Sequence, residues 1–203
     1  MGRFRALPLM MSLLLLGGCG GSGEVSGEDL ALDIQKEFSE MTACSCQVAL
    51  TADYETRVFD YVLDVTYDVT GGARLTIVEP EIAQGVTAAI QAGQTQLVYD
   101  GFSLDAGPPT GDGLSPLEAV PALYRAVAQG YIAGIDLAGE TLSVTYRDGE
   151  NEPGTGLEAV VCFDARSHAP LTGELYYDGV RVVQAQVKDF QSMAPQAEEA
   201  PAG

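Results

Sequence analysis

The residues of this chain that could do chemistry are few and far apart in the sequence. The single histidine, His168, follows Ser167 in a polar loop, but a serine next to a histidine in sequence does not make a catalytic triad. Asp60, Asp64 and Asp68 recur at every fourth residue, and a row of carboxylates of this kind usually faces solvent. We find no nucleophile elbow, phosphate loop, zinc-binding helix or dinucleotide fingerprint. The sequence therefore predicts a protein that is not an enzyme and that holds no metal or cofactor.

The covalent chemistry that the sequence does predict lies at Cys19. Arg3 and Arg5 precede the apolar stretch 6–16, which has the length of a signal peptide. Leu16-Gly17-Gly18-Cys19 resembles a bacterial lipobox, in which the cysteine thiol is alkylated with diacylglycerol and becomes the new N-terminus. We therefore expect a signal peptide at 1–18 and a lipidated cysteine with a flexible glycine-rich tether at 19–26. A secretory signal with a chance cysteine is the alternative.

This interpretation places the mature protein outside the cytoplasm, held to a membrane by its acyl chains. The membrane is the cell membrane, or an outer membrane if the envelope has two. The formal net charge of −19 disfavours nucleic acid and anionic lipid surfaces as partners. About 185 residues remain after cleavage, which is enough for one domain with a sizeable core.

Three further cysteines remain beside Cys19. Cys44 and Cys46 are two residues apart, so in a strand they share one face and would form a strained disulfide at best. Cys162 could form a disulfide with either of them outside the cytoplasm, and one thiol would then be left over. The alternative is a set of buried, reduced thiols that act as small hydrophobic side chains.

Two helices are predicted from capping residues and apolar spacing. The first covers 27–42, because Ser26 is a suitable N-cap and Leu30, Ile34, Phe38 and Met41 recur at helical spacing. The second covers 115–129, where Ser115-Pro116-Leu117-Glu118 reads as a helix start. Pro121 lacks an amide proton, so a kink or restart is expected there. The apolar face of the second helix consists of Leu117, Val120, Leu123, Tyr124 and Val127.

The rest of the chain is predicted to form antiparallel strands. The clearest alternation runs from Phe59 to Thr70, and Gly71-Gly72 then gives a hairpin signal. A strand of about twelve residues is long for a sandwich and favours a curved, wrapped sheet. The acidic stretch 193–203 reads as a disordered tail. The predicted strands are 44–53, 59–70, 73–78, 85–90, 95–99, 102–104, 142–146, 157–163, 171–177 and 180–190.

The order of these elements resembles the LolA and LolB family of lipoprotein carriers and receptors. The family also includes LolA-like lipoproteins of spore-forming Gram-positive bacteria, such as the germination lipoprotein GerS. The resemblance rests on the helix 27–42 leading into a strand, the long hairpin that begins at Phe59, and the strand 96–99 followed by Asp100-Gly101. It covers about residues 27–190, so we expect one LolA-like domain at 27–192.

The resemblance implies an α+β fold, mainly antiparallel β, in which an incompletely closed curved barrel is covered by helices on its open side. It also implies a concave apolar face that shelters the acyl chains of a ligand. The alternative is that the same inward row fills an ordinary dry core. The residues expected to bind a hydrophobic ligand are Phe59, Tyr61, Leu63, Val65, Tyr67, Leu75 and Ile77.

Two functions follow from the resemblance. The first is a non-catalytic, membrane-anchored lipoprotein that binds a hydrophobic ligand such as an acyl chain or another lipoprotein. The second is a GerS-like scaffold that partners a cell-wall amidase or another envelope protein in sporulation or germination. Exposed strand edges would also allow two copies to form a homodimer.

Overall fold

The computed structural model describes residues 26–70, 72–108 and 115–193. The predicted signal peptide at 1–18, the predicted lipidation site Cys19, its tether up to residue 25 and the tail from residue 194 lie outside the described residues. The elements in chain order are α1 (Gly27–Glu40), β1 (Ala43–Asp53), β2 (Val58–Asp68), β3 (Gly72–Glu79), the 3-10 turn η1 (Glu81–Ala83), β4 (Thr87–Gln91), β5 (Gln94–Tyr99), β6 (Phe102–Gly107), α2 (Pro116–Gln129), β7 (Tyr131–Ala138), β8 (Thr141–Arg147), β9 (Leu157–Asp164), β10 (Pro170–Tyr177) and β11 (Val180–Met193).

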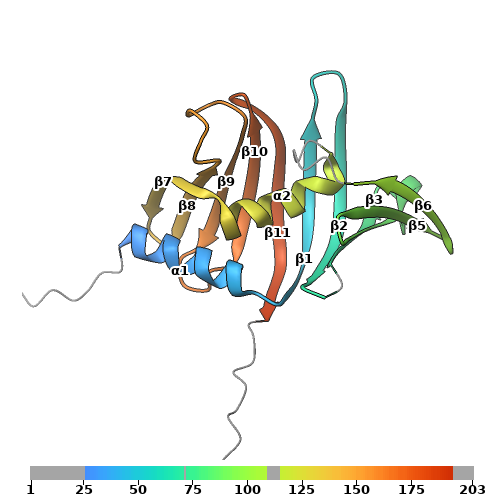
Figure 1. The fold of residues 1–203 in the computed structure, drawn as a ribbon, viewed down its shortest axis with the longest axis horizontal. Helices are drawn as coiled ribbons and strands as arrows, with labels where there is room; N and C mark the ends of the chain where they lie inside the picture. Colours follow the sequence, from blue (N-terminus) through green and yellow to red (C-terminus); the bar gives the residue numbers. More distant parts are fainter. Residues whose placement is uncertain (1–25, 71, 109–114, 194–203) are drawn as a thin grey trace, which may run out of the picture.

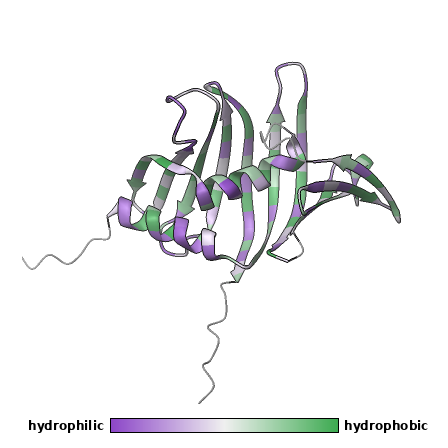
Figure 2. Cartoon of the chain, viewed as in Figure 1, coloured by the Kyte–Doolittle hydropathy of each residue, from purple (hydrophilic) through white to green (hydrophobic). Residues whose placement is uncertain are grey.

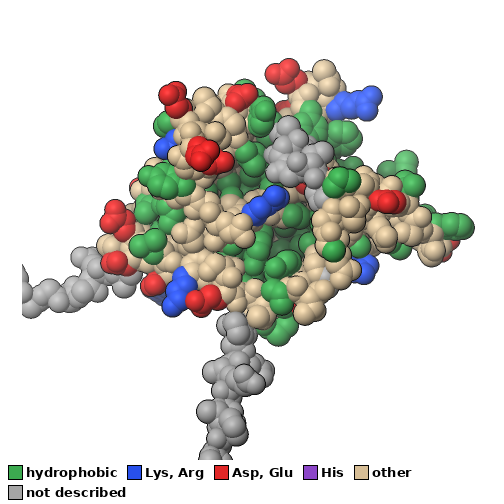
Figure 3. All heavy atoms as spheres, viewed as in Figure 1, with side chains coloured by type: hydrophobic (Ala, Val, Ile, Leu, Met, Phe, Trp, Pro, Cys, Tyr) green, Lys and Arg blue, Asp and Glu red, His purple; other side chains and the backbone are tan. Residues whose placement is uncertain are grey.

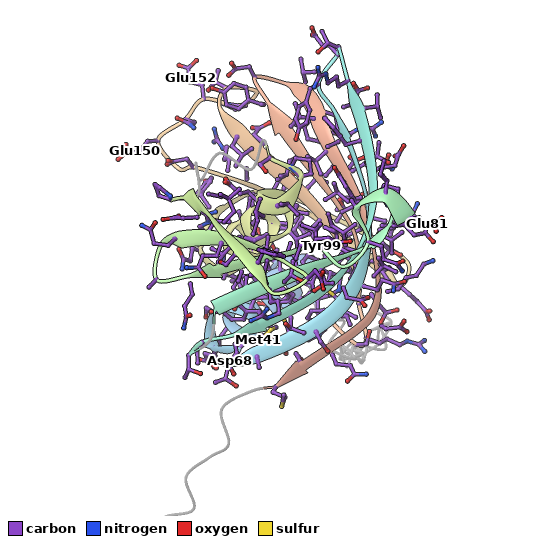
Figure 4. All side chains as sticks on the ribbon, turned by 90° about the vertical axis from the view of Figure 1, so that its right-hand side faces the viewer. Met41, Asp68, Glu81, Tyr99, Glu150 and Glu152 are labelled. Atoms are coloured by element: carbon purple, nitrogen blue, oxygen red, sulfur yellow. The ribbon has the colours of Figure 1, made fainter. Side chains whose placement is uncertain are left out.

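All the strands belong to one antiparallel sheet with the order β6-β5-β4-β3-β2-β1-β11-β10-β9-β8-β7. The first and last strands are neighbours at the centre, and β6 and β7 form the two edges. The sheet is curled but not closed, with both helices on its concave side (Figure 1). Seen from the side of β5 and β6, the sheet wraps around the helices, and Glu81 projects from its outer side (Figure 4). The fold class predicted from the sequence, an α+β fold with an incompletely closed antiparallel sheet and helices on its open side, is confirmed.

The long strands bury one face and expose the other. Along β2 the side chains of Leu63 and Val65 are buried, whereas Asp60, Asp64 and Asp68 are exposed. Hydrophobic and hydrophilic residues therefore alternate along the ribbon (Figure 2). The carboxylate row predicted to face solvent lies on the convex side, where Asp60 accepts a hydrogen bond from Thr51 and Asp64 accepts one from Gln47.

Helix α1 packs its apolar stripe on the concave face. The Ser26 side chain accepts a hydrogen bond from the backbone amide of Asp29, as expected of an N-cap. Leu30, Ile34 and Phe38 are buried on the stripe that faces the sheet. Helix α1 contacts α2, β7 and β8, so it covers the half of the sheet that contains the β7 edge (Figure 1).

Helix α2 connects the two edges of the sheet, because it follows β6 and leads directly into β7. It lies across the concave face between them (Figure 1). The helix continues through Pro121 without the predicted restart, and the Ser115 side chain makes no cap hydrogen bond. Pro116 stands at the first helical position, where an amide would lack a helical partner in any case. Pro121 lies further inside the helix, so it removes the hydrogen bond that an amide there would donate to the Leu117 carbonyl oxygen. Within the described residues, neither helix is long and apolar enough to cross a bilayer.

The structure also corrects several strand boundaries. Strand β7 was not predicted, and β6 continues to Gly107, beyond its predicted end at residue 104. Strand β2 ends at Asp68, which pairs with Gly72, so the reversal is one residue longer than the Gly71-Gly72 signal indicates. Val69 consequently leaves the inward row and is 56% exposed. Gly72 has a φ of +79°, and a Cβ there would lie 2.2 Å from the Ile90 carbonyl oxygen.

The packing of α1 can be tested with two substitutions in the same helix. Ile34→Ala removes a side chain that is 0% exposed, and we expect the free energy of unfolding to fall by about 2–5 kcal/mol. Leu32 lies on the outer side of the same helix and is 57% exposed, so Leu32→Ala should change stability by less than about 0.5 kcal/mol. Urea unfolding followed by circular dichroism measures both, and equal effects would contradict the packing.

Candidate functional site: an apolar cavity beneath helix α2

A cavity of about 460 Å³ lies between α2 and the concave face of the sheet. Among the described residues, its walls come from α1, α2 and seven strands: the central β1–β11 pair, β2, β3 and β4 on one side of it, and β9 and β10 on the other. In the space-filling view, hydrophobic side chains gather in a recess near the centre of this face (Figure 3). The side chains that form its sheet wall are mostly small or aliphatic, and include Cys44, Cys46, Val48, Val65, Ala73, Ile90, Ala185 and Val187.

Four aromatic rings stand at the side of the cavity where the helices meet the sheet. Tyr67 of β2 lies 4.8 Å from Tyr124 of α2, measured between ring centroids, and Tyr124 lies 5.9 Å from Phe38 of α1. Phe38 stacks on Phe190 of β11 at 5.8 Å with an interplanar angle of 5°. The hydroxyl of Tyr124 donates a hydrogen bond to the Phe38 carbonyl oxygen. We call these four residues the aromatic cluster; it links both helices to the sheet beside the cavity.

A bulge in β11 directs Phe190 into this cluster. Val183, Ala185 and Val187 point inward at every second residue, which would place Phe190 on the convex face. The β1–β11 register shifts between Ser45 and Gln47, and Asp189 has a φ of +53°. The extra residue reverses the alternation, so Phe190 lines the cavity.

On the other side of the centre, α2 comes close to the sheet. A Cβ at Gly173 of β10 would lie 2.8 Å from a methyl carbon of Leu123. Glycine at this position therefore lets Leu123 pack directly against the strand. Helix α2 therefore touches the sheet directly at Leu123, whereas at Tyr124 the aromatic rings stand between the helix and the sheet. The cavity lies between these two points of contact.

The three thiols of the described chain occupy opposite faces of the sheet. Cys44 and Cys46 line the cavity, whereas Cys162 alternates with the buried Val161 and Phe163 and so faces the convex side. All three are free, and neither Cys44 nor Cys46 can reach Cys162 through the sheet. Burial raises the pKa of Cys44 to about 11 and that of Cys46, which also lies beside Cys44, to about 12.

The seven residues predicted to bind a ligand occupy three different environments. Val65 and Tyr67 line the cavity. Leu63, Leu75 and Ile77 are at most 5% exposed and belong to the packed core. Phe59 and Tyr61 stack on each other at 6.3 Å further along β2 and are partly buried.

Much of the cavity wall lies outside that predicted set. The inward side chains of α2 that line it, Val120, Leu123, Tyr124 and Val127, belong to the apolar face expected for the second helix. Cys44 and Cys46 share the inward face of their predicted strand. No sequence signal indicated Phe190, because its direction depends on the bulge at Asp189.

Polar groups elsewhere in the structure do not converge on the cavity. Nδ1 of His168 lies 2.9 Å from the Glu37 carboxylate, and the Ser167 hydroxyl donates to Asp164 instead of to the histidine. Hydrogen bonds from Ser167 and Arg166 lower the pKa of the Asp164 carboxyl. Across residues 26–70, 72–108 and 115–193, no three metal-ligating side chains come together.

Comparison with known proteins gives similarity in fold only. No protein-family model and no curated protein sequence matches the chain. Solved structures that are similar include an uncharacterized conserved protein from Thermus thermophilus, with 11% identity, a TM-score of 0.48 and coverage of 84% of this chain and 90% of that chain. A structure of the CwlD amidase from Clostridioides difficile in complex with the GerS lipoprotein is similar at 20% identity and a TM-score of 0.47, with coverage of 83% of this chain and 97% of that chain.

A LolA superfamily protein from Nitrosomonas europaea is similar at 9% identity and a TM-score of 0.45, with coverage of 85% of this chain and 96% of that chain. None of these three chains is more than 20% identical to this one.

The raised thiol pKa values predict slow alkylation with a steep dependence on pH. Only the thiolate reacts with iodoacetamide, so the rates at Cys44 and Cys46 should rise about tenfold per pH unit between about pH 7 and 9. Mass spectrometry of single-cysteine variants measures each site. In the urea-unfolded chain both thiols regain a pKa near 8.5, so their rates should level off above it. A similar plateau in the folded protein would contradict the burial of these thiols.

Proposed function

We propose that this protein binds a hydrophobic ligand, such as an acyl chain or the acyl chains of a lipoprotein, in the cavity beneath α2. The observation that carries the proposal is the apolar cavity of about 460 Å³. Small-molecule sites typically measure about 300–1,000 Å³ and are lined mainly by hydrophobic and aromatic side chains. Moving apolar surface from water into such a site is favourable, so the cavity suits an apolar ligand.

The chemistry of the wall supports binding without catalysis. The two thiols that line the cavity, Cys44 and Cys46, have raised pKa values. They therefore remain protonated at neutral pH and contribute apolar surface instead of nucleophiles. Tyr124, whose pKa burial raises to about 12, also remains protonated and donates its hydroxyl proton to the Phe38 carbonyl.

The sequence supports a membrane-anchored, extracytoplasmic location for this binding protein. Leu16-Gly17-Gly18-Cys19 has the form of a lipobox, and glycines follow the cysteine. A lipid on Cys19 would hold the domain at the membrane surface, and the glycine-rich segment would let the cavity reach ligands away from it.

Filling the cavity should weaken binding without unfolding the protein. The neutral dye N-phenyl-1-naphthylamine, which fluoresces in apolar surroundings, is expected to bind saturably. Ala73 lines the cavity, so Ala73→Trp should place an indole in the empty volume and weaken dye binding by tenfold or more. Fluorescence titration measures both affinities, and thermal unfolding checks that the variant is folded.

A matched control places the same side chain outside the cavity. Ala138 is exposed on the edge strand β7, so Ala138→Trp should leave the affinity for the dye unchanged. If the dye fails to bind the unmodified protein, or if both variants bind it equally well, the proposed site is wrong.

The proposed anchor makes a separate prediction about Cys19. In a bacterial host supplied with an alkyne-bearing palmitate analogue, the full chain should incorporate the label and fractionate with membranes. Cys19→Ser should lose both the label and the membrane fraction, because the thiol that accepts the lipid is gone. Cys162→Ser, which alters an outward-facing thiol of the folded domain, should keep both. Label on the Cys19→Ser variant would show that the lipid is attached elsewhere.

A further inference from the structure

A second cavity, of about 600 Å³, lies at the C-terminal half of α2 and differs from the first in the character of its lining. It is bounded by α2, by the start of β7, by the end of β8 and the loop that follows it, and by the start of β9. Its polar side chains include Gln129, Tyr146, Arg147, Asp148 and Asn151. Polar groups thus gather on this side of the helix, whereas the cavity beneath α2 is almost wholly apolar.

Arg125 of α2 lines both cavities. Among the described residues it is the only basic one in the lining of the apolar cavity, and its side chain is exposed. Within the described chain it forms no ion pair and no hydrogen bond. In a protein with a formal net charge of −19, an arginine without a carboxylate partner at this junction is available to an anion from outside.

The polar cavity also holds hydrogen-bond donors that have no partner. Tyr146 is 0% exposed, and its hydroxyl makes no hydrogen bond with the described residues. The Nε of Arg147 is likewise buried without a partner, although the same guanidinium donates to the Asn151 carbonyl oxygen and lies over the Tyr131 ring. Buried polar groups are nearly always hydrogen-bonded in folded proteins. The group missing here is an acceptor, since both unpartnered groups can donate.

Two carboxylates in the linings restrict where an anion can sit. Glu118 lines the apolar cavity two helical turns before Arg125, and Asp148 lines the polar cavity next to Arg147. An anion is repelled near either carboxylate. The favourable position is therefore the junction at Arg125, on the side of Tyr146.

We propose that the ligand is an amphipath with an anionic head group, whose apolar chain lies in the cavity beneath α2 while its head is held by Arg125, with Tyr146 and Arg147 in the adjoining polar cavity. This inference rests on the proposed function, since it assigns the head group of the same ligand. A carboxylate and a phosphate present the same acceptor oxygens to an arginine. The class is thus an acidic lipid, either a fatty acid or a lipid phosphate.

Competition against the neutral dye N-phenyl-1-naphthylamine separates the head group from the chain. Myristate should displace the dye at about tenfold lower concentration than 1-tetradecanol, which has the same chain and an uncharged head. Tetradecyl phosphate, tested in parallel, distinguishes a phosphate head from a carboxylate head. If the dye does not bind, the proposed function fails; if the dye binds but the acids and the alcohol displace it equally, only this inference is overturned.

Substitution of Arg125 tests the residue itself. Arg125→Gln should bring the displacing concentrations of myristate and tetradecanol, each measured relative to the variant's own affinity for the dye, within about twofold of each other. Arg74, an exposed arginine on the convex face of β3, provides the control, and Arg74→Gln should keep the tenfold difference. A tenfold difference that survives in Arg125→Gln would overturn the assignment.

Tyr146→Phe tests whether the head enters the polar cavity. Removing a buried hydroxyl that has no partner should leave the melting temperature of the free protein unchanged or higher. The same change should weaken displacement by the anionic lipid about threefold without affecting tetradecanol. An unchanged preference for the acid would remove Tyr146 from the head-group site.

Discussion

The structure depends on how one connection crosses the sheet. Strands β1–β6 extend from the centre to one edge, and β7–β11 return from the opposite edge to pair with β1. The chain between β6 and β7 must therefore pass over one face from edge to edge. Ten strand spacings of about 4.8 Å would make a flat sheet about 48 Å wide, and the 14 residues of α2 account for about 21 Å of that distance. Curling of the sheet brings its edges closer, and it places α2 inside the curve.

A helix inside the curve of a sheet cannot touch every strand. Leu123 contacts the strand at Gly173, while the rings of Tyr67, Phe38 and Phe190 fill the space around Tyr124. The volume left between these contacts is too large to be a sealed void. At about 24 cal/mol per Å³, an empty cavity of 460 Å³ would cost about 11 kcal/mol, which is comparable to the whole stability of a typical domain. An opening to solvent avoids that cost in the free protein, and a bound apolar ligand would stabilise the fold in proportion to its affinity.

Sequence patterns predicted the fold better than the site. The alternation from Phe59 and the helical spacing of Leu30, Ile34 and Phe38 depend on burial of whole faces, which a one-dimensional pattern records. Strand β7 was missed because its alternation is interrupted where the β7–β8 register shifts between Ile132 and Gly134. The direction of Phe190 was missed for a similar reason, since one bulge residue changes the face of everything that follows it.

Leu63 and Val65 illustrate what such patterns cannot separate. The two residues share a face of β2, yet only Val65 lines the cavity. Coverage by other elements decides which inward positions pack and which remain open.

The cysteines show that surroundings, more than residue type, set the role of a side chain here. We propose that the Cys19 thiol is lipidated, because it follows a lipobox-like sequence. Cys44 and Cys46 carry the same group, but burial raises their pKa values and suppresses the reactive thiolate. Both line the cavity, where their small side chains leave room beneath α2. Larger aliphatic residues at these two positions would occupy the cavity and convert the site into ordinary core.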